Sequence, residues 1–234
     1  MKEKKNKKGY FSTAELCLWW GSAALIFIVF LLFDRESYLT LSASLIGVTS
    51  LIFNAKGNPV GQVLMVIFSI MYGIISFGFA YYGEMITYMG MTLPMAVVAL
   101  VEWLKNPFKG NRAEVAVNSI SKKELLFMLG LTAAVTAVFW FILGFFNTAN
   151  LVPGTVSVAT SFAAAYLTLR RSPWFAFVYG LNDLVLIVLW LLASLEDVSY
   201  LSVLVCFAVF FVNDIYGFIC WRRMQKRQSA HISA

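Results

Sequence analysis

The stretch VYGLNDLVLIVLWLL, from Val178 to Leu192, is an apolar run with an amide and a carboxyl side by side near its centre. A second run, FFVNDIYGFICW from Phe210 to Trp221, contains the same Asn-Asp pair. Apolar runs of about 17 to 25 residues predict helices that cross a bilayer, because backbone polar groups in lipid must hydrogen-bond within their own segment. The two pairs therefore place amides and carboxyls where water is scarce, and their role has to be explained.

The composition of the whole chain is that of a membrane protein. Of its 234 residues, 60% are hydrophobic and only 13% are charged, whereas soluble domains are about half apolar and a quarter charged. The fold class predicted is an all-α integral membrane protein with eight transmembrane helices. The predicted spans are Ala14–Phe33, Tyr38–Phe53, Val60–Tyr82, Met85–Leu104, Leu125–Phe146, Val152–Leu169, Trp174–Leu195 and Val198–Trp221.

The basic residues predict the orientation of these spans. With both termini inside, all 18 Lys and Arg residues except Arg35 fall in segments on the cytoplasmic side, as the positive-inside rule requires. The net charge of +6 is thereby explained by membrane topology. We do not predict a nucleic-acid partner, since the basic residues are spread over short segments. Three tryptophans lie at the cytoplasmic ends of their predicted spans, and we interpret them as interface anchors. They are Trp103, Trp174 and Trp221.

An internal repeat is visible in the order of the elements. LSASLIGVTSLIFNAKGNPVGQ (Leu41–Gln62) and TVSVATSFAAAYLTLRRSPWFA (Thr155–Ala176) are both helices rich in small residues that end in a basic turn and a proline. Each is followed by an apolar span, a short acidic outer turn that contains Glu84 or Glu196, and a last span. We interpret this as a parallel 3+1+3 repeat preceded by one extra N-terminal helix. Transporters built in this way bind substrate near the membrane midplane, between the repeats.

The predicted organisation has five parts. These are a basic tail and extra helix (1–37), a first three-helix unit (38–105), a linker and connecting helix (106–150), a second three-helix unit (151–223) and a cytoplasmic tail (224–234).

The polar residues inside the spans are the candidate site. An ionisable residue in the membrane normally faces a partner or a water-filled cavity, so these residues either join helices or line a substrate path. Asn182 and Trp190 share one helical face, and an amide beside an indole suits a planar heterocycle that carries hydroxyls. Adjacent residues differ by about 100° around a helix, so one member of each Asn-Asp pair is expected to face the cavity. The candidate substrate-binding residues are Asn182, Asp183, Trp190, Asn213, Asp214, Tyr216, Gln62 and Tyr72.

Three stretches carry a resemblance to a known family. NDLVLIVLWLL, VNDIYGFICWRR and YYGEMITY…VEWLKN resemble the PnuC family of bacterial vitamin transporters. The resemblance implies a SWEET-like fold in the bacterial cytoplasmic membrane, often as a homotrimer, and uptake of nicotinamide riboside by facilitated diffusion. A cytosolic kinase would draw uptake by phosphorylating the product. The pocket implied by the family uses Asn182, Trp190, Asn213, Tyr216 and Gln62. Relatives carry thiamine or riboflavin, which leaves the substrate open among three vitamins.

The sequence gives less support to functions of other classes. An intramembrane enzyme finds little support, because the only histidine, His231, lies in the tail and no metal or Ser–Lys arrangement occurs within the spans. We therefore expect no catalytic residue, metal or cofactor. A membrane scaffold is the second alternative, and it predicts that Asn182 and Asn213 affect stability alone.

Overall fold

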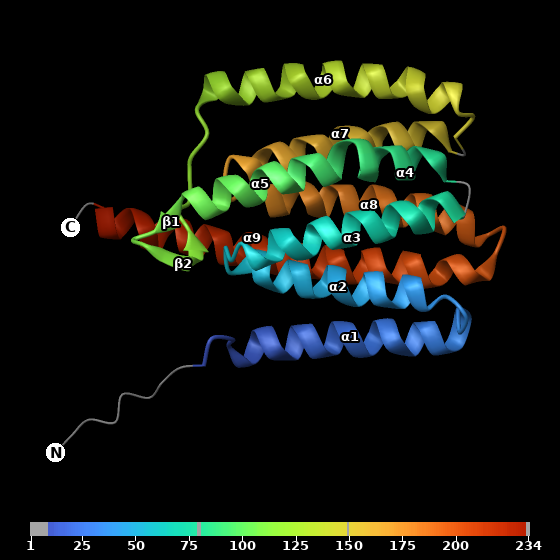
Figure 1. Cartoon of the computed structure of the whole chain (residues 1–234), viewed down its shortest axis with the longest axis horizontal. Coiled ribbons are helices and arrows are strands. Elements are labelled where there is room, and N and C mark those ends of the chain that lie inside the picture. The colour runs from blue at the N-terminus through green and yellow to red at the C-terminus, as the bar shows by residue number, and fades with distance from the viewer. Residues whose placement is uncertain (1–8, 79–80, 149, 233–234) are drawn as a thin grey trace.

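The computed structural model describes residues 9–78, 81–148 and 150–232. Long helices run side by side along the long axis of the molecule (Figure 1). Their bounds are α1 (Thr13–Phe33), α2 (Tyr38–Ala55), α3 (Val60–Gly78), α4 (Tyr82–Thr87), α5 (Leu93–Lys105), α6 (Lys122–Phe145), α7 (Leu151–Leu169), α8 (Phe175–Ser194) and α9 (Leu201–Ile232). A π-helical turn (Tyr88–Thr92) joins α4 to α5, a short 3₁₀ turn (Val198–Tyr200) precedes α9, and strands β1 (Pro107–Phe108) and β2 (Asn111–Val115) form a hairpin.

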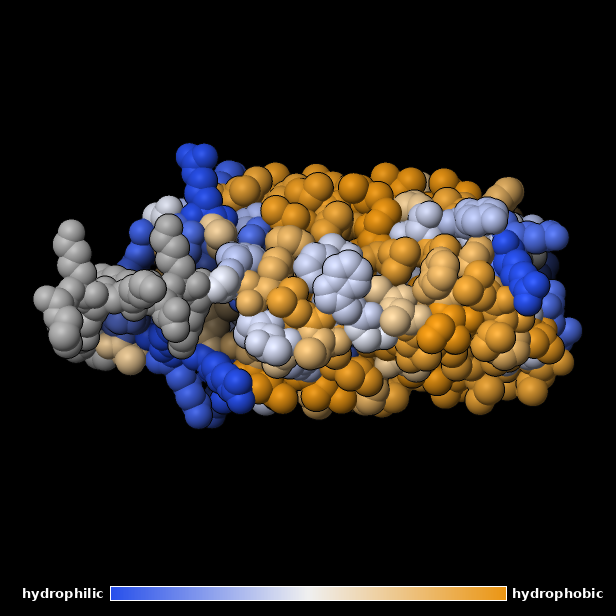
Figure 2. Space-filling model, turned by 90° about the horizontal axis from the view of Figure 1, so that it is seen from below, coloured by the Kyte–Doolittle hydropathy of each residue, from blue (hydrophilic) through white to orange (hydrophobic). Residues whose placement is uncertain are grey.

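Eight helical segments of the described chain are long and apolar enough to cross a membrane, which confirms the predicted number. The fourth of these segments combines α4, the π turn and α5 (Tyr82–Lys105). Hydrophilic surface covers both ends of the molecule, and apolar surface lies between them (Figure 2). We call one end the basic end, because it carries Lys56, Lys105, Arg170 and Arg222. The start of α1 and the end of α9 lie at this same end (Figure 1).

The helices of the predicted first unit pack directly against those of the second. In the first unit α3 packs on α2 and α5, and in the second α8 packs on α7 and α9. Across the units, α2 contacts α9 and α5 contacts α7. Helix α1 lies outside this core against α2 and α9, and α6 lies outside it against α7 (Figure 1).

Helices α2 and α7 end in the same way. The N–H of Gly57 donates to Asn54 O and that of Asn58 donates to Phe53 O, a Schellman pattern in which Gly57 has a φ of 66°. The second unit repeats the pattern: Arg171 N–H donates to Thr168 O, Ser172 N–H donates to Leu167 O, and Arg171 has a φ of 55°. A left-handed residue after the helix followed by a proline two positions later is thus common to both, which supports the predicted repeat.

Two tryptophans join these helix ends, and their interpretation as interface anchors is wrong. Trp103 on α5 and Trp221 on α9 are both fully buried, with ring centroids 5.4 Å apart. The Nε1–H of Trp103 donates to Thr168 O over 2.9 Å, and that of Trp221 donates to Asn54 O over 2.7 Å. Each indole therefore caps the first helix of the other predicted unit. Trp174 is 45% exposed, in keeping with an interfacial position.

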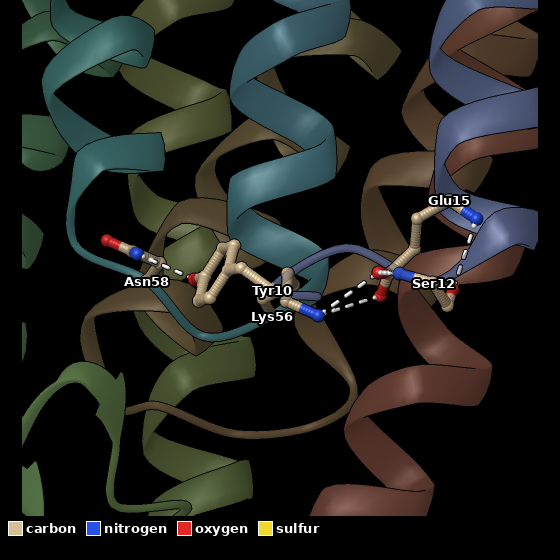
Figure 3. A network of polar contacts seen from close by, with 5 residues as sticks. All are labelled: Tyr10, Ser12, Glu15, Lys56 and Asn58. Carbon is tan, nitrogen blue, oxygen red and sulfur yellow. Dashed lines mark hydrogen bonds and ion pairs between the residues drawn. The ribbon is translucent and has the colours of Figure 1, made fainter. Parts of the chain in front are cut away.

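The N-terminal segment is tied to the turn between α2 and α3 (Figure 3). Ser12 and Glu15 form a capping box at the start of α1, as the Ser-x-x-Glu spacing predicts. Lys56 Nζ contacts both carboxylate oxygens of Glu15 at 3.1 Å. Asn58 donates to the Tyr10 hydroxyl over 2.7 Å. These contacts hold the extra helix α1 against the first three-helix unit.

The predicted linker and the predicted C-terminal tail both contain regular secondary structure. The linker contains the β1–β2 hairpin, and its backbone N–H groups at Val115 and Asn118 donate to Gly57 O and Arg171 O, the two equivalent helix ends. Residues 224–232, which belong to the predicted cytoplasmic tail, continue α9 without a break to Ile232. The continuation is stabilised by Gln228, which is only 4% exposed against the hairpin.

We predict that Gln228→Ala loosens this contact. The Gln228 side chain accepts from Val117 N–H (2.8 Å) and donates to Val115 O (3.0 Å) and Glu114 Oε1 (2.8 Å). Unsatisfied buried polar groups cost about 1–3 kcal/mol, so the free energy of unfolding should fall by about that amount. Thermal unfolding in detergent measures the loss, and faster amide exchange at Val117 would localise it. Gln225→Ala, which removes a bond to the exposed end of the linker, should have a smaller effect.

Candidate substrate site

The amide of Asn182 on α8 is held by three hydroxyls of α7. Its Oδ1 accepts from Thr160 (2.8 Å), Ser161 (3.0 Å) and Ser157 (3.4 Å). Asn182 is 2% exposed. Because the carbonyl oxygen is fixed toward α7, the planar amide directs its two N–H donors to the other side. The arrangement is a rigid, oriented donor inside the membrane-spanning part of the protein.

Asn182 lines a small enclosed cavity with a volume of about 30 Å³. The cavity also contacts Asp183 on α8, Asp214 on α9, and Tyr88 and Thr92 of the π turn. A water molecule needs about 10–15 Å³ of such volume, so the space holds one or two waters and is too small for a nucleoside. The structure is therefore closed around this site, and helices must move apart before a substrate enters.

Two acidic side chains meet at the cavity. The carboxyl of Asp183 is in hydrogen-bonding contact with that of Asp214, and both residues are at least 95% buried. Within the described ranges, Asp183 Oδ2 has no hydrogen-bond donor. Two ionised carboxylates in contact repel each other, so a proton shared between them or a cation beside them is needed.

An aromatic cluster lies next to the cavity and contacts its lining residue Tyr88. Trp190 on α8 donates from Nε1 to the hydroxyl of Tyr72 on α3 over 2.8 Å, which links the two predicted units. The Tyr72 ring centroid lies 4.3 Å from that of Tyr88, and the Trp190 centroid lies 4.9 Å from that of Tyr81. These rings offer flat apolar faces beside the polar groups of the cavity.

The structure brings together five of the eight sequence-predicted site residues. Asn182, Asp183 and Asp214 line the cavity, and Tyr72 and Trp190 form the cluster next to it. In the α8 pair both members line the cavity, although we expected only one to do so. In the α9 pair only Asp214 lines it, because the rotation of about 100° per residue turns Asn213 toward α1.

The other three predicted residues lie elsewhere. Asn213 donates to the hydroxyl of Ser22 on α1 over 3.0 Å. Gln62 donates to Asn54 Oδ1 over 2.8 Å at the basic end, where it joins α3 to α2. Tyr216 lines a cleft at the basic end.

Sequence reasoning missed two residues near the site. Glu84 was assigned to an exposed outer turn, but it lies in α4 and is 1% exposed. Tyr88 begins the π turn, and π turns occur frequently at functional sites. The signal available was the spacing of four between Glu84 and Tyr88, which places both on one helical face.

The fold and the site together define the class of protein. Six of the eight apolar spans of the described chain supply the lining of the cavity, which together with the aromatic cluster beside it we call the chamber. Membrane transporters hold small molecules in chambers of this kind, within their membrane-spanning part. The chain matches the family described as nicotinamide mononucleotide transporter over residues 37–223 and belongs to that family. It is a multi-pass membrane transporter and not an enzyme, and the resemblance stated from the sequence is confirmed.

Two comparisons agree with this assignment. The nicotinamide riboside transporter PnuC of Neisseria mucosa is 24% identical over 226 residues, which cover 94% of this chain and 84% of that protein. The crystal structure of the vitamin B3 transporter PnuC has the same fold, with a TM-score of 0.83 and 22% identity over 94% of this chain and 95% of that one.

Proposed function

We propose that this chain imports nicotinamide riboside by facilitated diffusion. The observation that carries the proposal is that the ionisable side chains buried between the helices are acidic. Glu84, Asp183 and Asp214 are buried between the helices, and none of the buried side chains in the described ranges is Lys or Arg. An interior with carboxyls, tyrosines and a tryptophan favours a cationic aromatic ring, such as the pyridinium of nicotinamide riboside.

The same observation separates the candidate substrates. Nicotinamide mononucleotide carries a phosphate, which proteins bind with Lys, Arg or helix N-termini, and no basic side chain reaches the described interior. Riboflavin is neutral and gains nothing from buried carboxyls. Thiamine is cationic and is the second candidate, but it has a single hydroxyl for the Asn182 donors, whereas the riboside offers several. The name of the Neisseria relative also supports the riboside.

The mechanism follows from the closed chamber. We infer alternating access, in which the two three-helix units rock against each other around the site without a coupling ion. The Trp190–Tyr72 hydrogen bond and the Asp183–Asp214 contact would break or shift as the chamber opens. The proposed location is the bacterial cytoplasmic membrane, with both termini and the basic end in the cytoplasm. A cytosolic kinase would retain the substrate by phosphorylation, and the assembly proposed is a homotrimer.

A transport assay tests the proposal. In vesicles that contain the purified protein, labelled nicotinamide riboside should equilibrate across the membrane, and a pH gradient should not change the final distribution. Unlabelled nicotinamide riboside should compete, while riboflavin and nicotinamide mononucleotide should not. Uptake above equilibrium driven by protons would contradict facilitated diffusion. Stronger competition by thiamine than by the riboside would favour the second candidate.

A further inference from the structure

The carboxyl of Glu84 is buried and makes no ion pair with any residue that the structure describes. The residue is 1% exposed, and in the part of the chain that the structure describes neither Oε1 nor Oε2 accepts a hydrogen bond of ordinary geometry. The four ion pairs of the described chain all use other acids. Burying an unpaired carboxylate is costly, and ionisable residues kept inside membrane proteins mark substrate or ion paths.

Three tyrosines lie near this carboxyl. Glu84 lies close enough to Tyr72, Tyr81 and Tyr88 for its charge to act on all three hydroxyls. Tyr72 and Tyr81 both pack against Trp190, with centroid distances of 6.2 Å and 4.9 Å. An acid among several aromatic faces is the arrangement that binds organic cations, through ring faces within about 6 Å of the positive charge.

One residue connects Glu84 to the oriented amide. The hydroxyl of Ser157 on α7 lies beside the Glu84 carboxyl, without a hydrogen bond of ordinary geometry to it, and is 3.4 Å from Asn182 Oδ1. Ser157 itself is fully buried. The acid and the amide are therefore two anchor points in one region, suited to a molecule with a cationic ring at one end and hydroxyls at the other.

We propose that Glu84 is the residue that recognises the positive charge of the transported molecule. The proposal rests on the proposed function, because it names the group that selects a cation in that same site. Asp183 and Asp214 are less suited to this role, since their carboxyls contact each other and none of the described residues that line their cavity is a tryptophan. Glu84 also lies in the first turn of α4, at the end of the bundle opposite the basic end, where an imported molecule would arrive (Figure 1).

Removal of the charge tests the proposal directly. The probes are nicotinamide riboside and its dihydro form, which keeps the ribose and the amide but has an uncharged ring. The wild type should bind the cation at least about tenfold more tightly, the size expected of one charge-assisted contact. Glu84→Gln should lose this preference by weakening the cation alone. Glu36→Gln removes the same charge from an exposed position at the same end of the bundle and should keep the preference.

The outcomes are distinct. A folded Glu84→Gln protein that still prefers the cation, or that loses both probes equally, overturns the proposal. A wild type that binds neither probe overturns the proposed function instead. If Glu84→Gln does not fold, Glu84→Asp decides, because it keeps the charge: preference for the cation supports the proposal, and equal affinity for both probes overturns it.

Discussion

Asn182→Leu should weaken the binding of nicotinamide riboside by about ten- to hundredfold and leave a folded protein, because among the described residues Asn182 provides the only amide side chain that lines the cavity. The cost in stability should be small. Leucine has a similar volume, and the hydroxyls of α7 that lose their acceptor can donate to carbonyls of their own helix instead. The Thr160 hydroxyl, for example, already lies 3.0 Å from Val156 O. Binding to the purified protein by calorimetry measures the effect, with thermal unfolding as the check on folding.

Asn213→Leu is the matched control for this experiment. Asn213, like Asn182, is only 2% exposed. It makes a comparable hydrogen bond over 3.0 Å, but its partner is Ser22 on α1 and not a residue of the chamber. The exchange should lower stability and leave affinity within about twofold, since no contact at the site is lost. Equal loss of affinity in both variants would show that the amides act through packing, as a scaffold would require. An unchanged affinity in Asn182→Leu would remove this residue from the site.

The number of spans was predictable because it depends on the length of each apolar run and not on which helices the run packs against. A run of apolar residues must form a helix in lipid wherever it packs, and all eight runs did so. The break in the fourth span was not visible in this pattern, since the stretch Tyr82–Lys105 is apolar enough as a whole to count as one span. That break is what brings Tyr88 and Thr92 to the cavity.

Which neighbouring helix a buried side chain faces was harder to predict than whether the side chain is buried. The Asn-Asp pairs were correctly read as buried, but the sequence holds no information on which neighbour each face meets. Asn213 faces α1 because that helix covers the outside of α9, a consequence of tertiary packing. Trp103 and Trp221 sit at span ends, where an indole usually meets lipid headgroups, and only the reciprocal packing of two helix ends explains their burial.

Trp221→Ala should produce the largest loss of stability. The indole is fully buried against Trp103 and Phe175, and its Nε1–H satisfies Asn54 O at the end of α2. Replacing a buried Trp by Ala costs about 3–5 kcal/mol in free energy of unfolding. Trp103→Ala should cost a similar amount, because its bond to Thr168 O is the equivalent contact in the other predicted unit. Chemical unfolding in a mild detergent measures both.

Trp174→Ala supplies the control, since this ring is 45% exposed and its contacts are with Arg222 and two phenylalanines at the surface. Its loss should cost about 1 kcal/mol or less. The double variant of Trp103 and Trp221 should cost less than the sum of the single changes, because the rings touch and the first deletion already opens the shared space. Strict additivity, or a Trp174 effect as large as that of Trp221, would mean that the reciprocal contact does not hold the two units together.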